Sequence, residues 1–490
     1  MKRFLLAISF VAVLLAGCTK DEAEEVTETA AAEEQKEEKV IVKDNITLSE
    51  KRGEIGTNIT FTVDELEPDS DVQLIWLKYD GKYLIEDLYV VKGAEYTESE
   101  LVIAEGKADA NGEFTGQFEV PDTFGANNTI QVKQNNTVVG QTNFNVWPTF
   151  ELEPKSGPPG TEITIKVKGI GWSTYNRNWQ VTYDNHYTGI LTAVSTNGTA
   201  HGKIRATGKP GDHYISVRTG YLGSPYINFQ QSPHADKPKP DLVFTITDEP
   251  AVNTENYVEP IPKAAGGGVE MPKPENKKGV DVKLSVEEGI VGAPVTLTAT
   301  GLPANESIDL IWNTMVGSRV SGLGFEGTNS TLTALKTDAN GNLNYDFTVP
   351  DDLGGIPHRI DLKVGDEIYG QTYLRILPSI VDFSPKSGPA GTPVTVTIKG
   401  GGWTEFDNAY YMTYDNSHMG YMCSFNSQGT LIFEFIATGD KGFHYIDLYP
   451  GIYRWAQEDT DPALIPQLTY AEDHPGSAMP AIRMAFEITE

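Results

Sequence analysis

The stretch SGPPGTEITIKVKGIGW at residues 156–172 decides the fold of this chain. Ile163, Ile165 and Val167 alternate with polar residues, which is the two-residue period of a strand with one buried face. A Pro-Gly turn precedes this strand and a glycine follows it, so the strand is short and clearly bounded. The stretch returns as SGPAGTPVTVTIKGGGW at residues 387–403 with the same alternation.

The chain is an internal duplication built around these two stretches. Residues 154–220 align with residues 385–451 at a constant offset of 231, without a gap, and 27 of the 67 aligned residues are identical. The shared motifs are PKSGPxGT, KGxGW, TYDN and ATGxxGxHYI. A second, more divergent pair precedes each copy, because residues 46–63 parallel residues 282–299. The order of the units is therefore A, B, A′, B′.

Units of about 100 residues with short alternating strands and Gly, Pro, Asn and Asp turns are typical of β-sandwiches. The two stretches quoted above resemble the opening strands of IPT/TIG domains, which have an immunoglobulin-like fold. ANGEFTGQFEVPD (110–122) and ANGNLNYDFTVPD (339–351) resemble the central hairpin of Ig-like modules in bacterial surface proteins. We therefore expect an all-β fold of four tandem Ig-like β-sandwich domains in an A-B-A′-B′ duplication. The resemblance implies a fold and names no ligand.

The repeats set the expected domain boundaries. We place domain A at residues 41–147, B at 148–249, A′ at 280–376 and B′ at 377–490. Residues 250–279 are rich in proline and contain three consecutive glycines, which predicts a linker and a hinge between the halves. A passes into B, and A′ into B′, with almost no spare residues, so each pair is expected to be stiff.

The first 18 residues resemble a bacterial lipoprotein signal. Lys2 and Arg3 form a positive region, residues 4–15 are apolar but too short to span a bilayer, and LAGC ends at Cys18. The resemblance implies that residues 1–17 are removed and that the Cys18 thiol takes a lipid. This predicts an extracytoplasmic protein, lipid-anchored to the bacterial cell membrane or outer membrane.

The segment at residues 18–40 is strongly acidic. Residues 19–39 hold nine Asp or Glu and three Lys, a composition that favours an extended, solvated tether, with a short acidic helix as the alternative. The whole chain has a formal net charge of −30. No basic stripe is present, so nucleic acid is not expected as a partner. With Cys18 lipidated, only Cys423 remains, and we expect no intrachain disulfide.

Three repeated motifs have both a structural and a chemical interpretation. His213 and His444 could be metal ligands or bases, but we expect them to cap a turn. The DANG motifs at 109–112 and 338–341 begin like a calcium loop, but a hairpin turn is favoured because no bidentate acid follows. The TYDN motif at 182–185 and its copy are expected to be turns with Asx hydrogen bonds, and otherwise a ligand contact.

Aromatic residues follow the KGxGW turns. Trp172 and Trp403 are expected to fill the sandwich cores, since an Ig-like domain without a disulfide needs a large central side chain. The alternative is an exposed platform for sugar rings, to which Tyr175, Trp179, Phe406 and Tyr410 would also contribute.

The loops before the last strand of B and of B′ are where the two aligned copies diverge. Variable loops on a repeated scaffold carry specificity, and aromatic side chains offer contact area at modest entropic cost. The ligand-binding candidates are Tyr221, Tyr226, Phe229 and His234 in B, and Tyr453, Trp455, Tyr470 and His474 in B′.

The sequence contains no nucleophile elbow, phosphate loop, CxxC pair or HExxH motif. We therefore expect no enzyme, no catalytic residue, no metal site and no cofactor. The leading hypothesis is a membrane-anchored surface lipoprotein that binds or displays a partner through its tandem Ig-like domains. The expected partner is an envelope polysaccharide or protein. A passive stalk or scaffold subunit is the second hypothesis, and a hydrolase or metal site between domains is the third.

Replacement of the lipidated residue tests the anchor. Cys18→Ala should release the protein from membranes, because the sequence offers no other membrane-binding segment. Detergent phase separation measures this release. A variant that stays in the detergent phase would show that the anchor assignment is wrong.

Overall fold

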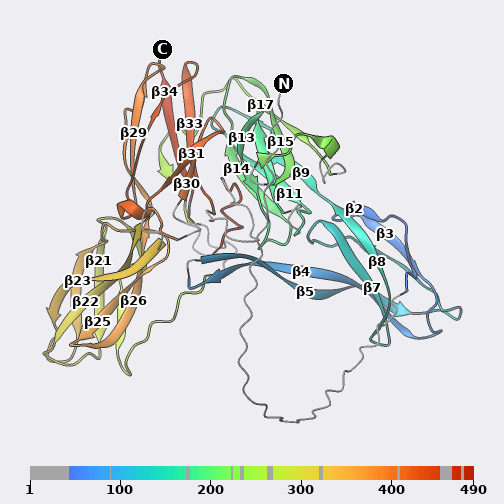
Figure 1. Ribbon diagram of the computed structural model, residues 1–490, viewed down its shortest axis with the longest axis horizontal. Helices are drawn as coiled ribbons and strands as arrows, with labels where there is room; N and C mark the ends of the chain where they lie inside the picture. The colour runs from blue at the N-terminus through green and yellow to red at the C-terminus, as the bar shows by residue number, and fades with distance from the viewer. Residues whose placement is uncertain are drawn as a thin grey trace, which may run out of the picture. The chain divides into compact units, whose positions relative to one another are not determined.

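A computed structural model describes residues 43–490, except for residue 89 and segments 173–176, 222–223, 232–236, 262–268, 319–323, 405–408, 453–465 and 476–478 (Figure 1). The described residues contain no α-helix, and their helical turns are the short 3₁₀ segments η1 (Phe229–Gln231) and η2 (Phe425–Ser427). All other regular structure is β-strand, which confirms the all-β prediction.

Domain A has two sheets, in which all strand pairs but one are antiparallel. One sheet has the order β1 (Ile46–Leu48), β3 (Asn58–Val63), β6 (Phe114–Glu119). The other has the order β2 (Arg52–Glu54), β8 (Thr137–Trp147), β7 (Ala126–Gln134), β4 (Asp71–Glu86), β5 (Val90–Lys107). The chain changes sheet after β1, and β2 pairs parallel with β8. This strand order is that of an immunoglobulin-like sandwich.

Domain A′ repeats this order. Its sheets are β19 (Asp281–Leu284), β21 (Pro294–Thr300), β24 (Leu343–Thr348), and β20 (Glu288–Ile290), β26 (Glu367–Leu377), β25 (His358–Val364), β22 (Ser307–Ser318), β23 (Gly324–Lys336).

Domain B follows the same order from its own strands. The sheets are β14 (Ala200–Arg205), β11 (Glu162–Lys168), β9 (Thr149–Glu153), and β10 (Ser156–Gly157), β17 (Asp241–Ile246), β15 (Gly211–Tyr221), β12 (Trp179–Tyr183), β13 (His186–Leu191), with β16 (Ser224–Pro225) on β15.

Domain B′ adds a strand from outside its own range. Its sheets are β27 (Ser379–Ser384), β29 (Pro393–Lys399), β32 (Leu431–Ile436), and β18 (Tyr257–Val258), β34 (Ile482–Ile488), β33 (Gly442–Pro450), β30 (Ala409–Tyr414), β31 (Ser417–Cys423), with β28 (Ser387–Gly388) on β34.

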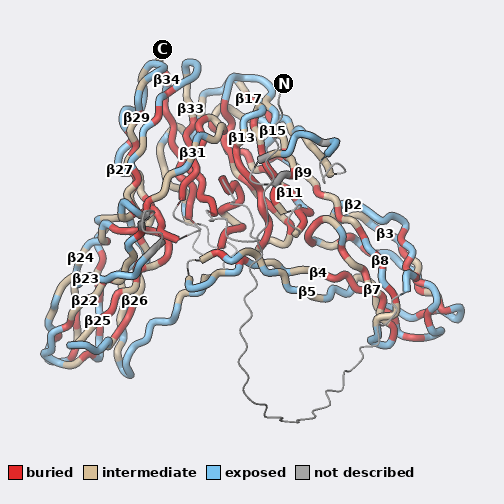
Figure 2. Tube along the Cα trace, viewed as in Figure 1, coloured by how far each residue is buried: buried red, intermediate tan, exposed pale blue. Residues whose placement is uncertain are grey.

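The buried residues line the inner faces of these sheets (Figure 2). Ile163, Ile165 and Val167 on β11 are buried in the core of B, as their alternation predicted. Each core has a large buried aromatic residue on the equivalent strand of its domain. These residues are Trp76 on β4, Trp179 on β12, Trp312 on β22 and Tyr410 on β30.

The prediction that Trp172 fills the core of B is wrong. Its ring is half-buried and packs between domains, with its centroid 5.0 Å from that of Tyr79 and 5.6 Å from that of Tyr96, both on the β4–β5 hairpin of A. Trp403 is buried, but in a cluster shared by several domains and not in the core of B′. The strands before the two KGxGW turns end at Lys168 and Lys399, so each tryptophan lies beyond its strand and outside the core. Trp179 on β12 and Tyr410 on β30 occupy the central core positions instead.

Both A–B connections are close backbone contacts. The Gly125 N–H donates to the Ile170 carbonyl at 2.9 Å, and Gly354 N–H donates to the carbonyl of Gly401, the repeat counterpart of Ile170, at 2.7 Å. A Cβ atom on Gly125 would collide with the carbonyl of Gly169, so glycine is required for this approach.

The linker does not behave as the free hinge that its composition predicted. Tyr257 and Val258 form β18 and pair with β34 of B′. The Asn256 side chain accepts the Ala485 N–H at 2.9 Å, and the Asn276 side chain accepts the Gln371 N–H at 2.7 Å. Nearer its start, the Val252 N–H donates to the Pro159 carbonyl of B at 2.8 Å. The described linker residues are therefore bonded to B as well as to A′ and B′.

The two tryptophans of B should differ in their contribution to stability. Trp179→Ala should lower the free energy of unfolding by about 3–5 kcal/mol, because it leaves a cavity in the core. Trp172→Ala should lower it by less, since the ring is half-buried. Urea unfolding followed by circular dichroism measures both. An equal or larger effect of Trp172→Ala would contradict this assignment.

Candidate functional site

The candidate loop of B has an exposed apolar part. Tyr226 is 43% exposed and Ile227 is 80% exposed, directly after β16. Tyr221 ends β15 and Phe229 begins η1, but their side chains are outside the described set, as is His234. The ligand-contact role of this loop stays a prediction.

The candidate loop of B′ is different. Tyr453 and Trp455 lie outside the described residues. Tyr470 and His474 are fully buried, so the expectation that they present a contact surface needs correction. The physical reason is that residues 466–475 pack against neighbouring domains.

Residues 466–470 of B′ lie between the two sheets of B. The Ile190 N–H on β13 donates to the Pro466 carbonyl at 2.8 Å, and the Leu468 N–H donates back to the Ile190 carbonyl at 2.9 Å. On the other side, the Lys203 N–H of β14 donates to the Leu468 carbonyl at 3.3 Å. The segment is thus hydrogen-bonded to the edge strands of both sheets.

Asp473 follows this segment and is fully buried. Its carboxylate accepts the backbone N–H groups of Val194 at 3.0 Å and Ser195 at 2.9 Å, and the Ser195 hydroxyl at 2.6 Å. It also accepts the Tyr83 hydroxyl from the hairpin of A at 3.2 Å. Burial and the charge of Asp473 raise the pKa of Tyr83 well above its ordinary value, so the phenol remains a donor. One carboxylate therefore joins A, B and B′.

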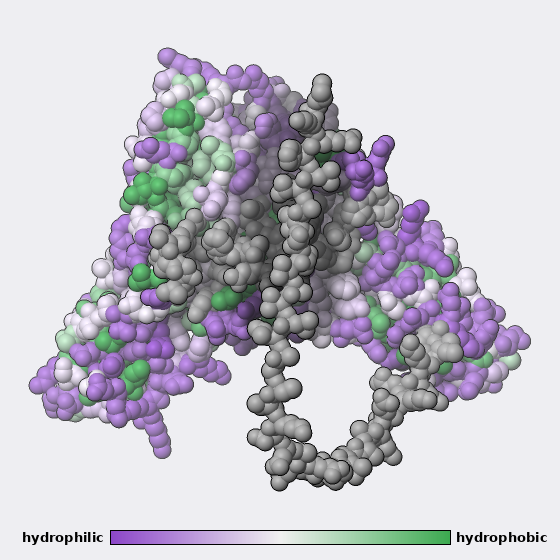
Figure 3. Space-filling view, viewed as in Figure 1, coloured by the Kyte–Doolittle hydropathy of each residue, from purple (hydrophilic) through white to green (hydrophobic). Residues whose placement is uncertain are grey.

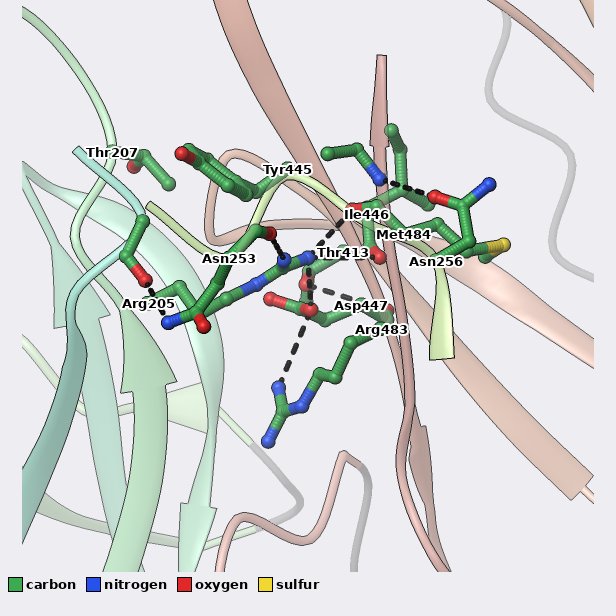
Figure 4. Close-up of polar contacts among 12 residues, drawn as sticks. Arg205, Thr207, Asn253, Asn256, Thr413, Tyr445, Ile446, Asp447, Arg483 and Met484 are labelled. Atoms are coloured by element: carbon green, nitrogen blue, oxygen red, sulfur yellow. Dashed lines mark hydrogen bonds and ion pairs between the residues drawn. The ribbon is translucent and has the colours of Figure 1, made fainter. Parts of the chain in front are cut away.

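The contact between B and B′ also has a charged centre (Figure 4). The Asp447 carboxylate of β33 lies between two guanidinium groups, with Oδ1 2.5 Å from Arg205 Nη2 of B and 3.3 Å from Arg483 Nη1 of B′. All three side chains are almost completely buried. Arg205 also donates to the carbonyls of Ile446 at 3.2 Å and Met484 at 2.6 Å.

Arg483 has a second set of partners. Its Nε lies 2.7 Å from Glu259 Oε1 of the linker, and its Nη atoms donate to the hydroxyls of Tyr449 and Tyr470. Burial acts to lower the pKa of Arg483, but Tyr449, Tyr470 and the two carboxylates outweigh it and raise the pKa. Loss of one partner in such a buried group leaves an unpaired charge, which costs about 3–5 kcal/mol.

The repeated histidines complete a turn, as expected. His213 Nδ1 lies 2.6 Å from Asp184 Oδ2 of TYDN, and its Nε2 lies 2.8 Å from the Lys209 carbonyl. Asp184 and Asn185 have positive φ angles of 47° and 68°, which their short polar side chains tolerate. The same arrangement recurs in B′, where His444 Nδ1 lies 2.5 Å from Asp415.

The DANG motifs also form turns. Asp109 Oδ1 accepts the N–H groups of Glu113 at 2.9 Å and Asn111 at 2.8 Å, and these bonds lower the pKa of Asp109. The turn links β5 to β6, which pair with other strands in different sheets, so it is not the predicted hairpin. In the part of the chain that the structure describes, no three His, Cys, Asp or Glu side chains are grouped so as to hold a metal ion.

The residues that join the domains were not among the predicted site residues, although the repeat contains a signal for them. At several positions where B contacts B′, the aligned residues of the two copies belong to different chemical classes. Arg205 aligns with Ile436, Asp447 aligns with Ser216, and Gly202 aligns with Phe433. At these three aligned positions, a change of residue class coincides with a contact between B and B′.

The strand order of all four units defines a protein of tandem immunoglobulin-like sandwiches. No family model matches the chain, and no curated protein matches it. Among the described residues no helix has the length and apolar character needed to cross a membrane.

Similar solved structures are distant. Salmonella alpha-2-macroglobulin reacted with methylamine is 11% identical, with a TM-score of 0.19, and the match covers 92% of this chain and 31% of that chain. A Corynebacterium diphtheriae protein described as membrane anchored is 11% identical, with a TM-score of 0.17 and coverage of 68% and 89%. A D1–D4 ectodomain fragment of ICAM-5 is 11% identical, with a TM-score of 0.16 and coverage of 86% and 98%.

The chain spans less than a third of the length of the Salmonella protein. The assignment of the fold rests on the strand order and not on these likenesses.

The His444 pair predicts a pH dependence. Burial lowers the pKa of His444, but the hydrogen bond and charge of Asp415 outweigh it and raise the pKa. The pair therefore stabilises the fold fully below the ordinary histidine pKa of about 6.5, and this contribution is lost as pH rises through the raised value.

Titration of the histidine Cε1 proton signals by NMR measures the pKa directly. Asp415→Asn should return the pKa of His444 toward its ordinary value. A pKa that does not fall in this variant would contradict the role of Asp415.

Proposed function

We propose that this chain is a non-enzymatic, lipid-anchored protein of the bacterial cell surface that binds an envelope polysaccharide or protein. The binding surface is the loop between β15 and β17 of B. The observation that supports this most strongly is the exposure of Tyr226 and Ile227, side by side in that loop. Exposed aromatic and aliphatic side chains at one place are typical of contact surfaces.

On the face of the molecule that Figure 3 shows, hydrophilic residues predominate, with hydrophobic patches between them. Ile227, at 80% exposure, is the most exposed large hydrophobic residue among those described. The chain is acidic overall, with a net charge of −30. An acidic surface disfavours anionic partners, so an uncharged glycan or an apolar protein surface suits the loop better.

The anchor and the family belong to the same proposal. The LAGC signal at Cys18 supports an extracytoplasmic location with a lipid in the membrane. The PKSGPxGT entry and the alternating strand after it support membership of the IPT/TIG group for B and B′. Rigid display of the loop is supported by the contacts that join B to its neighbours. These contacts are made by Asp473 and by the Arg205–Asp447–Arg483 group.

The passive scaffold is the second candidate, and the same contacts favour it. A scaffold needs fixed domains but no ligand. The two candidates therefore differ only in whether the exposed loop of B has a partner.

The experiment is a pull-down of envelope material by the chain without its signal peptide and lipid. The double variant Tyr226→Ser/Ile227→Ser should reduce the recovered partner by about tenfold or more, as expected for contact residues worth about 1–2 kcal/mol. The matched control is Ile432→Ser/Ile436→Ser, which removes two equally exposed aliphatic residues from B′.

Protease treatment of the recovered material separates a protein partner from a glycan. Equal recovery by the loop variant and the control variant would contradict the binding proposal and leave the scaffold.

A further inference from the structure

Domain B has an opening between its two sheets that residues 148–249, as far as the structure describes them, do not fill. β13 and β14 are the edge strands of the two sheets on the same side of the sandwich. On β14, the residue that faces the core between Ala200 and Ile204 is Gly202. Leu191 of β13 covers this glycine, because a Cβ atom on Gly202 would lie 2.2 Å from Leu191 Cδ2. The space beside Leu191, between β13 and β14, is not filled by any of the described side chains of B.

Leu468 of B′ fills this gap. Its side chain is fully buried and belongs to the core cluster of B. A Cβ atom on Gly189 would lie 2.8 Å from Leu468 Cγ, and one on Gly202 would lie 3.3 Å from Leu468 Cβ. Gly189 therefore makes room for the segment that arrives from B′, whereas Gly202 makes room first for Leu191 and only then for Leu468.

The aligned positions of B′ show which side chains fill the core at this place when the domain supplies them itself. In B′ the position of Gly202 is occupied by Phe433, and that of Leu191 by Met422. Phe433 and Met422 pack against the core of B′. B therefore has no side chain where its copy has a partly buried phenylalanine, and Leu468 of residues 466–470 belongs to its core cluster.

The residues on either side of Leu468, Gln467 and Thr469, make side-chain contacts with B that depend on their identity. Thr469 Oγ1 lies 2.9 Å from Thr192 Oγ1 and accepts the Thr192 N–H at 3.2 Å. The Gln467 amide donates to Thr192 Oγ1 at 3.1 Å. Gln467 forms one parallel bridge with Ile190, and residues 468–472 are in turns. The segment is therefore held by a few main-chain bonds to the strand edges, one buried side chain and the polar contacts on either side of it.

We infer that the groove between β13 and β14 of B is a binding site for a peptide segment with the pattern Gln-Leu-Thr, in the bridge-and-turn conformation of residues 466–470. Residues 466–470 of B′ occupy this groove as an intramolecular ligand. The inference does not depend on the exposed loop proposed above as the partner site, because that loop lies after β15 and none of its described residues belongs to the contacts named here.

The test opens the groove in the full chain. Leu468→Asp places a charge where only an apolar side chain fits, so the segment leaves the groove. A fluorescent peptide of residues 466–472 should then bind the variant about tenfold or more tightly than it binds the unmodified chain, in which the site is occupied. The same peptide carrying Leu468→Asp should not bind either protein.

A closed variant provides the matched control. Leu191→Met/Gly202→Phe, added to Leu468→Asp, gives B the residues with which B′ fills its own core. This triple variant should fold and should not bind the peptide. Equal binding of the two peptides, or no binding by a Leu468→Asp variant that remains folded, would overturn the inference.

Hydrogen exchange decides the question if Leu468→Asp does not fold. In Leu468→Ala, the amides of Ile190 and Lys203 should exchange about tenfold or more rapidly, because they donate to residues 466 and 468. The amides of β21 in A′ should not change. Unchanged exchange at Ile190 and Lys203 would equally overturn the inference.

Discussion

The burial of Leu468 in domain B is the interaction on which the arrangement of the other contacts depends. Full burial of one leucine side chain contributes about 1.5–3 kcal/mol, and its carbonyl and N–H are bonded to both sheets of B. The same short segment then places Tyr470 against Arg483 and Asp473 against Tyr83. If Leu468 were elsewhere, neither polar contact could form. An apolar contact therefore positions the charged ones, which alone would not repay their desolvation.

The fold was predictable because its signal is local. Alternation over a few residues, as at Ile163, Ile165 and Val167, reports a strand with one buried face whatever the rest of the chain does. The contacts between domains were not predictable in this way, since Thr192 and Thr469 are 277 residues apart. Tyr470 and His474 were interpreted as surface residues because aromatic residues in an irregular loop have no period that shows what they pack against. Trp172 was assigned to a core for a similar reason.

The duplication has kept one set of residues and changed another. The Tyr-Asp-His turn is the same in B and B′, and in both copies the histidine stacks on the tyrosine. This set stabilises each sandwich from within. The positions that differ, such as Gly202 against Phe433 and Arg205 against Ile436, lie where B receives B′. After duplication, one copy became the acceptor and the other became the donor.

The position of the inserted segment near the end of the chain determines when B can finish folding. A chain synthesised from its N-terminus presents all strands of B long before residue 466 emerges. During that interval the edge strands β13 and β14 lack their partner, and the core of B lacks one apolar side chain. B therefore has to wait for a contact of very high sequence separation, which is the slowest kind to form. Its open edge is exposed to aggregation for that time, so the burden on chaperones falls on the second domain and not on the last.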